Sequence, residues 1–284
     1  MEIFEMESSK SGNYFLAAEF EKKVAVYESV TSRKLGEYNT HFTSGGKRMC
    51  ITDSGKYFAA AAYGRFGITL FDIEKQNALW TTKEIKRIQQ ISFSADDNKL
   101  FAINNDDKLY TISLTDGSVI SVEKNIRNIF PDSTLKVKLA SDEHHLTWDG
   151  GSANLTGKIL RLCSGNNKVF CSIMGGGLKC FSVEGSELWY TKNRLEEHYI
   201  KLCYCPKFDF IIGLGFKFGS ERIEPFYFLD VYSAASGDIA YSVGLNDAFR
   251  YTFIDNGEKI VSGTGNVYIL QKDSYTVSEK QFDI

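Results

Sequence analysis

The chain has 284 residues, 43% of them hydrophobic and 24% charged, which is a composition that can bury a core and excludes an intrinsically disordered chain. Its formal net charge of −3 supplies no overall positive field, which argues against general nucleic-acid binding. The first ten residues carry acidic side chains where an export signal needs a basic start, and no run of about 18 apolar residues occurs. We therefore expect a cytoplasmic protein that neither crosses a membrane nor binds one.

The first repeated signal along the chain is a polar turn followed by an apolar strand. Asp, Asn and Gly favour turns, and the β-branched and aromatic residues that follow suit a pleated sheet. Each copy therefore predicts a short strand that starts from a tight turn. The five copies are SGNYFLAA from Ser11, DSGKYFAAAA from Asp53, ADDNKLFAI from Ala95, GNNKVFCSI from Gly165 and DNGEKIVSG from Asp255.

The second repeated signal is an alternating strand that ends in a polar residue. It occurs six times, as VAVYE ending at Glu28, ITLFD at Asp72, LYTIS at Ser113, LKCFS at Ser182, FYFLD at Asp230 and VYILQ at Gln271. The fourth residues of these strands are separated by 44, 41, 69, 48 and 41 positions. A gap of 69 is too long for one unit and fits two compressed ones. We therefore predict a degenerate unit near residues 126–157, with LKVKLAS and HHLTWDG as its strands, and seven units in all, with six as the alternative.

A period of 40–50 residues indicates a propeller, in which blades stack around an axis and leave only short, protected edges. Only three prolines occur, polar turns recur every 8–12 residues, and no stretch shows a helical period. The sequence predicts an all-β fold, a single propeller domain of four-stranded antiparallel blades. The expected blades span residues 1–41, 46–84, 87–124, 126–157, 158–194, 197–245 and 248–284. The terminal segment TVSEKQFDI can supply an outer strand.

These repeats resemble those of the WD-repeat propellers and of the related quinoprotein-like propellers. ITLFD, ending at Asp72, resembles the end of the third strand of a WD repeat, and NALW with Trp80 and SELW with Trp189 resemble the start of an outer strand in the quinoprotein-type repeat. No Trp-Asp dipeptide is expected at the end of the third strand in any blade, and no Gly-His pair occurs. The WD-repeat resemblance implies a rigid ring that serves as a platform for protein partners.

The residues with reactive side chains favour structural roles. His144 and His145 are adjacent and would point to opposite faces of a strand, which favours a solvated turn over a metal site. Gly175, Gly176 and Gly177 join two strands as a hairpin and lack the Lys and the helix of a phosphate loop. We predict no catalytic residue, metal or cofactor. Buried reduced thiols are expected at Cys50, Cys163, Cys171, Cys180, Cys203 and Cys205, with a cluster of Cys163, Cys171 and Cys180 on three successive strands as the alternative.

One irregular hairpin suggests a binding face. In the sixth unit, an excursion from about Phe216 to Glu224 replaces a short turn, and YGRFG forms the matching hairpin of the second unit. A loop packed on its own blade is the alternative explanation. Propeller geometry places these hairpins at one end of the disc, together with Glu21, Asp106 and Asp107. The predicted partner-binding residues are Tyr63, Arg65, Phe66, Phe216, Lys217, Phe218, Glu221, Arg222, Asp247 and Arg250.

The function predicted from these features is a non-enzymatic platform that binds a protein on one propeller face. A bacterial immunity protein that neutralises a cognate toxin is a specific alternative. A carbohydrate-active or lyase-type enzyme with its site at the central channel is a competing class, and it predicts converging carboxylates or a metal there. We expect a monomer, although the sequence does not determine the oligomeric state.

Overall fold

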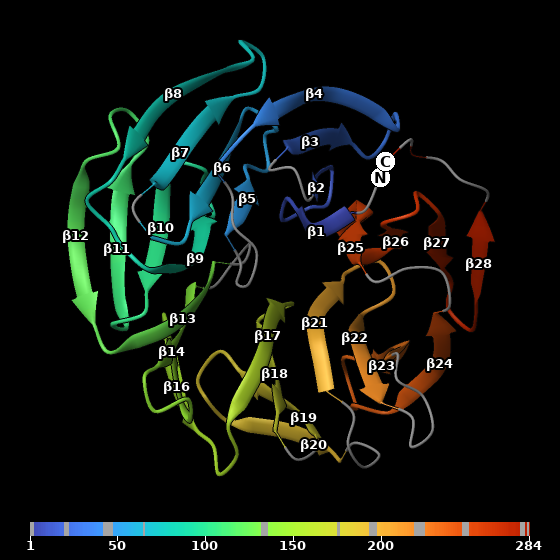
Figure 1. The fold of residues 1–284 in the computed structure, drawn as a ribbon. Helices are drawn as coiled ribbons and strands as arrows, with labels where there is room; N and C mark the ends of the chain where they lie inside the picture. Colours follow the sequence, from blue (N-terminus) through green and yellow to red (C-terminus); the bar gives the residue numbers. More distant parts are fainter. Residues whose placement is uncertain are drawn as a thin grey trace.

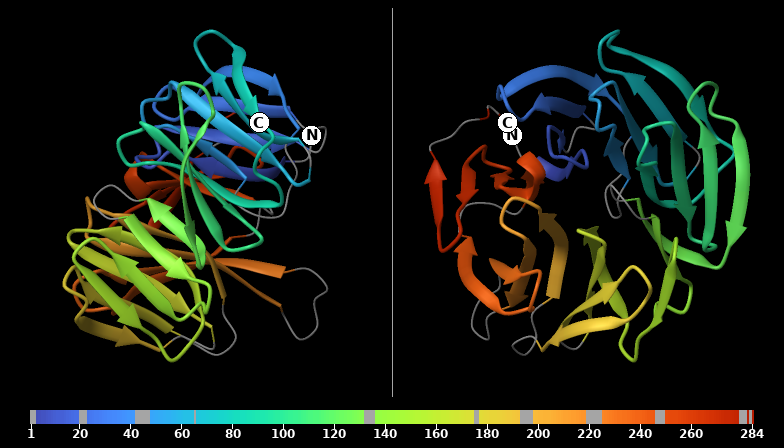
Figure 2. Two further views of the ribbon diagram at one scale, coloured as in Figure 1. Left: turned by 90° about the vertical axis from the view of Figure 1, so that its left-hand side faces the viewer. Right: turned by 180° about the vertical axis from the view of Figure 1, so that it is seen from behind.

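Seven four-stranded antiparallel sheets stand around a central axis, so the molecule is an all-β propeller of seven blades (Figure 1). The computed structural model describes residues 3–19, 23–41, 48–64, 66–131, 136–174, 177–192, 198–218, 225–245, 250–278, 282 and 284. The first strand of each blade lies nearest the axis, as the view from behind also shows (Figure 2). The predicted fold class and the count of seven blades are confirmed.

Each blade of the described chain is built from four strands that are consecutive in sequence. The strands are β1 Ile3–Ser8, β2 Tyr14–Glu19, β3 Lys23–Glu28 and β4 Arg33–Asn39 in blade 1; β5 Met49–Ile51, β6 Tyr57–Ala62, β7 Gly67–Asp72 and β8 Asn77–Thr82 in blade 2; β9 Ile88–Phe93, β10 Lys99–Asn104, β11 Lys108–Ser113 and β12 Val119–Lys124 in blade 3; β13 Ile126–Pro131, β14 Lys136–Ala140, β15 His145–Trp148 and β16 Gly151–Asn154 in blade 4. The remaining strands are β17 Ile159–Gly165, β18 Lys168–Ile173, β19 Gly177–Ser182 and β20 Glu187–Thr191 in blade 5; β21 His198–Cys205, β22 Phe210–Phe218, β23 Pro225–Ser233 and β24 Ile239–Leu245 in blade 6; β25 Tyr251–Ile254, β26 Lys259–Ser262, β27 Val267–Leu270 and β28 Tyr275–Ser278 in blade 7.

The disc has two faces that differ in which loops they carry. Because four antiparallel strands return the chain to its starting end, every first strand begins at the same face. We call this the entry face, and it also carries the hairpins between second and third strands. The exit face carries the turns between first and second strands. Within the described ranges the only helical segment is the short 3-10 turn Asp255–Gly257, and no helix there is long and apolar enough to cross a membrane.

The turns of the exit face explain the first repeated signal. Gly12 has a φ of 73°, and a Cβ at this position would lie 2.5 Å from the Cα atom of Ile254 in blade 7. Glycine therefore satisfies both the left-handed backbone and the close approach of a neighbouring blade. The same turns bond blade to blade, because the backbone N–H and the hydroxyl of Ser11 donate to Asp53 Oδ1 at 2.7 and 2.6 Å.

The fourth blade accounts for the long gap in the repeat. Its third strand, β15, ends at Trp148 and is followed by Asp149, so a Trp-Asp dipeptide does occur at the end of a third strand. The expectation that no blade carries it was wrong. Trp148 lies 36 positions after Ile112 and 33 before Phe181, because β15 and β16 are joined by a tight turn of only two residues.

Tryptophan side chains fasten neighbouring blades near the outside of the disc. Each indole N–H donates to a backbone carbonyl in the turn between the third and fourth strands of the next blade. A buried indole whose N–H is bonded fixes the angle between two blades as well as filling the gap. The three pairs are Trp80 with Leu114 at 2.8 Å, Trp148 with Val183 at 2.7 Å and Trp189 with Ala234 at 3.1 Å.

The first strands of neighbouring blades are joined by side chains, since the seven sheets share no ladder. Among the described residues, a long polar side chain of a first strand, or of the residue just before it, donates to a backbone carbonyl of the next blade in four places, and Lys201 of blade 6 donates to the non-neighbouring blade 1. The pairs are Arg48 Nε with Ile88 at 2.8 Å, Gln90 Nε2 with Ile129 at 2.6 Å, Lys201 Nζ with Met6 at 2.7 Å, Arg161 Nε with Ile200, and Arg250 Nε with Phe4.

The ring closes by contact between blades 1 and 7, because no described sheet combines strands from both ends of the chain. The C-terminal Phe282 is 1% exposed and lies edge-on to Phe15 and Tyr27 of blade 1, with ring centroids 4.9 and 6.1 Å apart. Its backbone N–H donates to the Gly265 carbonyl of blade 7 at 3.3 Å. The Phe282 side chain therefore fills the junction between the first and last blades. The terminal segment also supplies the predicted outer strand, β28.

Replacing Phe282 with alanine should destabilise the closed ring. The change removes a buried aromatic side chain from the junction, and such changes cost about 3–5 kcal/mol. Urea unfolding, monitored by tryptophan fluorescence, would measure this loss in the free energy of unfolding. The matched control is Val277→Ala in β28, which is 54% exposed and should change the free energy of unfolding by less than about 0.5 kcal/mol. Equal stabilities of the two variants would contradict the role of Phe282 in closure.

Candidate functional site

Two exposed aromatic side chains of the predicted binding set lie together on the entry face. Tyr63 and Phe66 occupy the hairpin between β6 and β7 of blade 2 and are 47% and 38% exposed. Arg65, which lies between them, is outside the described residues. An exposed pair of large aromatic rings in one short hairpin is unusual for a solvated turn, because turns favour small polar residues.

The ring of Tyr63 is held from two sides. The guanidinium carbon of the buried Arg48 lies 5.1 Å from its centroid, which is a cation–π distance. The side-chain amide of Asn105 in blade 3 donates to the Tyr63 hydroxyl at 3.2 Å. Tyr63 is therefore exposed and also fixed in orientation.

Phe66 is supported by a residue of the preceding connection. Its ring stacks on the imidazole of His41, with centroids 4.5 Å apart and planes 18° apart. His41 follows β4, so the contact joins the end of blade 1 to the hairpin of blade 2. The aromatic pair thus lies over the boundary of blades 1, 2 and 3.

The irregular hairpin of blade 6 begins later than predicted. β22 continues to Phe218, which pairs with Pro225 of β23, so Phe216 lies in a strand and not in a loop. The Phe216 ring is half-buried and packs against Tyr227, with centroids 6.3 Å apart. The expectation of a loop starting at Phe216 was wrong, because the alternation of the two strands continues through FKF and PFYF.

The extended strands β22 and β23 project beyond their neighbours as a hairpin arm (Figure 2, left, orange). Glu221 and Arg222, which were predicted to contact a partner, lie outside the described residues. The same is true of the side chains of Lys217 and Phe218.

The charged residues predicted for this face differ in their roles. Arg250 is exposed, and its guanidinium donates to the Phe4 carbonyl of blade 1, so it also joins the ends of the ring. Asp106 is ion-paired with Arg87, and Asp107 Oδ1 lies 3.1 Å from Arg127 Nη1. These two carboxylates therefore have partners within the fold. Glu21 and Asp247 lie outside the described residues.

The histidines and four of the six cysteines take the positions expected, whereas Cys50 and Cys203 are only partly buried. The backbone N–H groups of His144 and His145 both donate to Asp142 Oδ1 at 3.0 Å, which forms a polar turn before β15. All six cysteines are free thiols, and Cys163, Cys171 and Cys180 lie on the three successive strands β17, β18 and β19. Among the described residues no group of three His, Cys, Asp or Glu side chains is placed to hold a metal.

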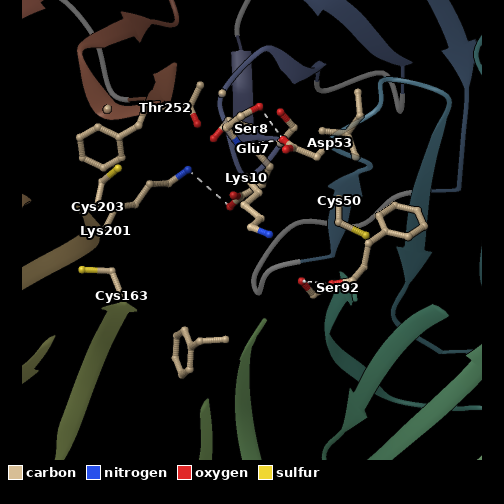
Figure 3. A pocket seen from close by; sticks show the side chains of 18 of the residues that line it. Glu7, Ser8, Lys10, Cys50, Asp53, Ser92, Cys163, Lys201, Cys203 and Thr252 are labelled. Atoms are coloured by element: carbon tan, nitrogen blue, oxygen red, sulfur yellow. Dashed lines mark hydrogen bonds and ion pairs between the residues drawn. The ribbon is translucent and has the colours of Figure 1, made fainter. Parts of the chain in front are cut away.

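A cavity of about 460 Å³ occupies the central channel and is lined by the first strands of all seven blades (Figure 3). Its lining includes residues of the exit-face turns, among them Ser11, Asp53 and Asn256, so the cavity extends towards that face. Glu7 lies in its wall, 3.4 Å from Lys201 Nζ across the channel. The enzymatic alternative predicts carboxylates that converge from different blades, and the wall carries Glu7, Asp53 and Asp97 from blades 1, 2 and 3.

Glu5 has the most perturbed carboxyl group of the channel strands. Burial, followed by the nearby charge of Glu7, raises the pKa of Glu5 to about 8, although Lys201, Arg250 and Arg48 act in the opposite direction. The carboxyl is therefore largely protonated at neutral pH.

Comparison with known proteins supports the fold. No family model matches the sequence, and no curated protein matches it. The structure is similar to that of Hsv2 from Kluyveromyces lactis, with a TM-score of 0.75 at 9% sequence identity over 98% of this chain and 97% of that one. It is also similar to the WD40 repeats of RRP9, with a TM-score of 0.68 at 12% identity over 93% and 87% of the two chains. The predicted resemblance to WD-repeat propellers is thus confirmed as a likeness of fold.

Replacing Glu5 with glutamine should change how stability depends on pH. The folded protein binds the Glu5 proton more tightly than the unfolded chain, whose pKa is the ordinary 4.5, so wild type loses stability as the pH rises from about 4.5 to 8. The Glu5→Gln variant lacks this loss. A shift of one pKa unit corresponds to about 1.4 kcal/mol. Allowing for partial solvent screening, we expect the free energies of unfolding of wild type and Glu5→Gln to diverge by about 1–3 kcal/mol between pH 5 and pH 8.

Urea unfolding across this pH range would measure the divergence. Glu84→Gln, on the exposed connection between blades 2 and 3, is the control and should follow wild type. Parallel pH profiles for wild type and Glu5→Gln would show that Glu5 is not buried as described.

Proposed function

We propose that the protein is a non-enzymatic platform that binds a protein partner on its entry face. The observation that carries this proposal is the exposed aromatic pair, Tyr63 and Phe66, whose rings are oriented by Arg48 and His41. Tyrosine and arginine are enriched where binding energy concentrates in interfaces, and a side chain that is already ordered loses little entropy on binding.

The surroundings of the pair support an interface with an apolar centre and a charged rim. Arg87 and Asp106 form an ion pair on the blade 3 side, and Arg250 is exposed at the start of blade 7. Such a mixture is typical of non-obligate protein interfaces. The hairpin arm of β22 and β23 extends on the same face and offers a second point of contact, which includes the predicted residues Lys217, Phe218, Glu221 and Arg222. Arg65 and Asp247 complete the proposed interface.

The double variant Tyr63→Ala, Phe66→Ala should abolish partner binding and leave the fold intact, because both side chains lie on the surface and not in the core. The measurement is affinity capture from a lysate of the source cells with stable-isotope quantification, followed by calorimetry with the purified partner. We expect one stoichiometric protein on wild type and at least a tenfold weaker interaction with the variant.

The matched control is Ile120→Ala, Val122→Ala, which removes two side chains that are 57% and 48% exposed on the outer strand β12. This variant should retain the partner fully. Retention of the partner by the Tyr63 and Phe66 variant, or absence of any stoichiometric partner on wild type, would refute the proposed interface.

A further inference from the structure

The channel cavity has the size and lining of a small-molecule site, separate from the entry face. Its volume of about 460 Å³ is in the range of known ligand pockets, roughly 300–1,000 Å³. Hydroxyl and thiol groups line its wall. Figure 3 shows Ser8, Ser92 and Thr252 together with Cys50, Cys163 and Cys203 around the open centre.

Arg161 is a cation in this wall without a counter-ion. Its guanidinium is half-buried, with Nε donating to the Ile200 carbonyl and Nη1 to the Leu160 carbonyl at 2.6 Å. Among the described residues no carboxylate lies within ion-pair distance of it. Burial lowers its pKa, and Glu7 is the one described acidic group whose field opposes this. A cation taken partly out of water costs free energy unless an anion is placed beside it.

The cavity wall also carries three carboxylates, and each has partners other than Arg161. Glu7 pairs with Lys201 at 3.4 Å. Asp53 accepts the N–H and O–H of Ser11, and Asp97 accepts the backbone N–H groups of Asp53 and Ser54 at 3.2 and 3.0 Å.

Lys10 adds a second positive charge without a carboxylate partner among the described residues. It is exposed and lies in the wall of the cavity, in the exit-face turn after β1. The cavity is lined by three basic residues, Lys10, Arg161 and Lys201, and three acidic ones, Glu7, Asp53 and Asp97. Among the described residues, Lys201 is the one basic group of this set with a carboxylate within ion-pair distance.

We propose that the channel cavity binds a small organic anion whose carboxylate or phosphate group contacts the Arg161 guanidinium. A guanidinium presents paired N–H donors that match both groups, and its remaining donors supply these bonds after two are used on backbone carbonyls. The rest of the ligand lies along the hydroxyl groups of the wall towards Lys10. The site is reached from the exit face, so it does not depend on partner binding at the entry face.

The test uses citrate and glucose 6-phosphate as probes, with neutral glucose as the control ligand. Isothermal titration calorimetry is carried out on the full chain in a Tris chloride buffer of low ionic strength. At least one of the two anions should bind with one-to-one stoichiometry, and glucose should not. Binding of citrate alone assigns the site to carboxylates, and binding of glucose 6-phosphate alone assigns it to phosphates.

Variants connect the binding to the cavity. Arg161→Gln should weaken binding of the anion at least tenfold, whereas Arg33→Gln, at the exposed start of β4 in blade 1, should leave it unchanged. Because Arg161 also bonds blade 6, a second variant, Ser92→Phe, fills the cavity without altering its charge and should block binding as well. The Tyr63 and Phe66 variant should bind the anion normally. Failure of both anions to bind wild type, or wild-type affinity in both Arg161→Gln and Ser92→Phe, would overturn the proposal.

Discussion

The structure depends on how the backbone hydrogen-bonding groups at the inner edges of seven separate sheets find partners. The first strand of each blade has a partner strand on one side only, so its other edge presents unpaired backbone groups to the channel. Neighbouring first strands do not form a ladder across this gap. Long polar side chains bridge it instead, with Arg48, Arg161 and Arg250 donating to carbonyls of the next blade. This requirement places cationic side chains in a channel whose lining also holds Glu7, Asp53 and Asp97.

The same bridging residues connect the interior of the ring to its entry face. Arg48 is buried, and its Nε bonds the Ile88 carbonyl of blade 3 while its guanidinium lies over the ring of Tyr63. A residue needed to join blades 2 and 3 thereby fixes an exposed aromatic ring. The proposed interface is preorganised by the fold, which is the condition under which a small aromatic pair contributes most to affinity.

The sequence predicts the blades well because their signals are local. The Asp, Asn and Gly turns and the alternating strands depend on residues a few positions apart, and they locate second and third strands directly. Trp148 escaped alignment because its unit is compressed, with Asp149 and Gly150 as the whole turn. The supports of the candidate site, His41 under Phe66 and Arg48 under Tyr63, could not be predicted, since these contacts join segments that only the closed ring brings together.

A comparison of Gln90 with Arg161 shows what the bridging role itself requires. The Gln90 amide donates to the Ile129 carbonyl at 2.6 Å and accepts the Ile129 N–H at 3.2 Å, so a neutral side chain joins blades 3 and 4 with donor and acceptor both used. Arg161 joins blades 5 and 6 through one donor and brings a full charge that has no carboxylate within ion-pair distance among the described residues, although the field of Glu7 acts on it. Because Gln90 makes the same kind of bridge without charge, the bridge alone does not require the charge of Arg161, and this charge is available to the anion proposed to bind in the channel.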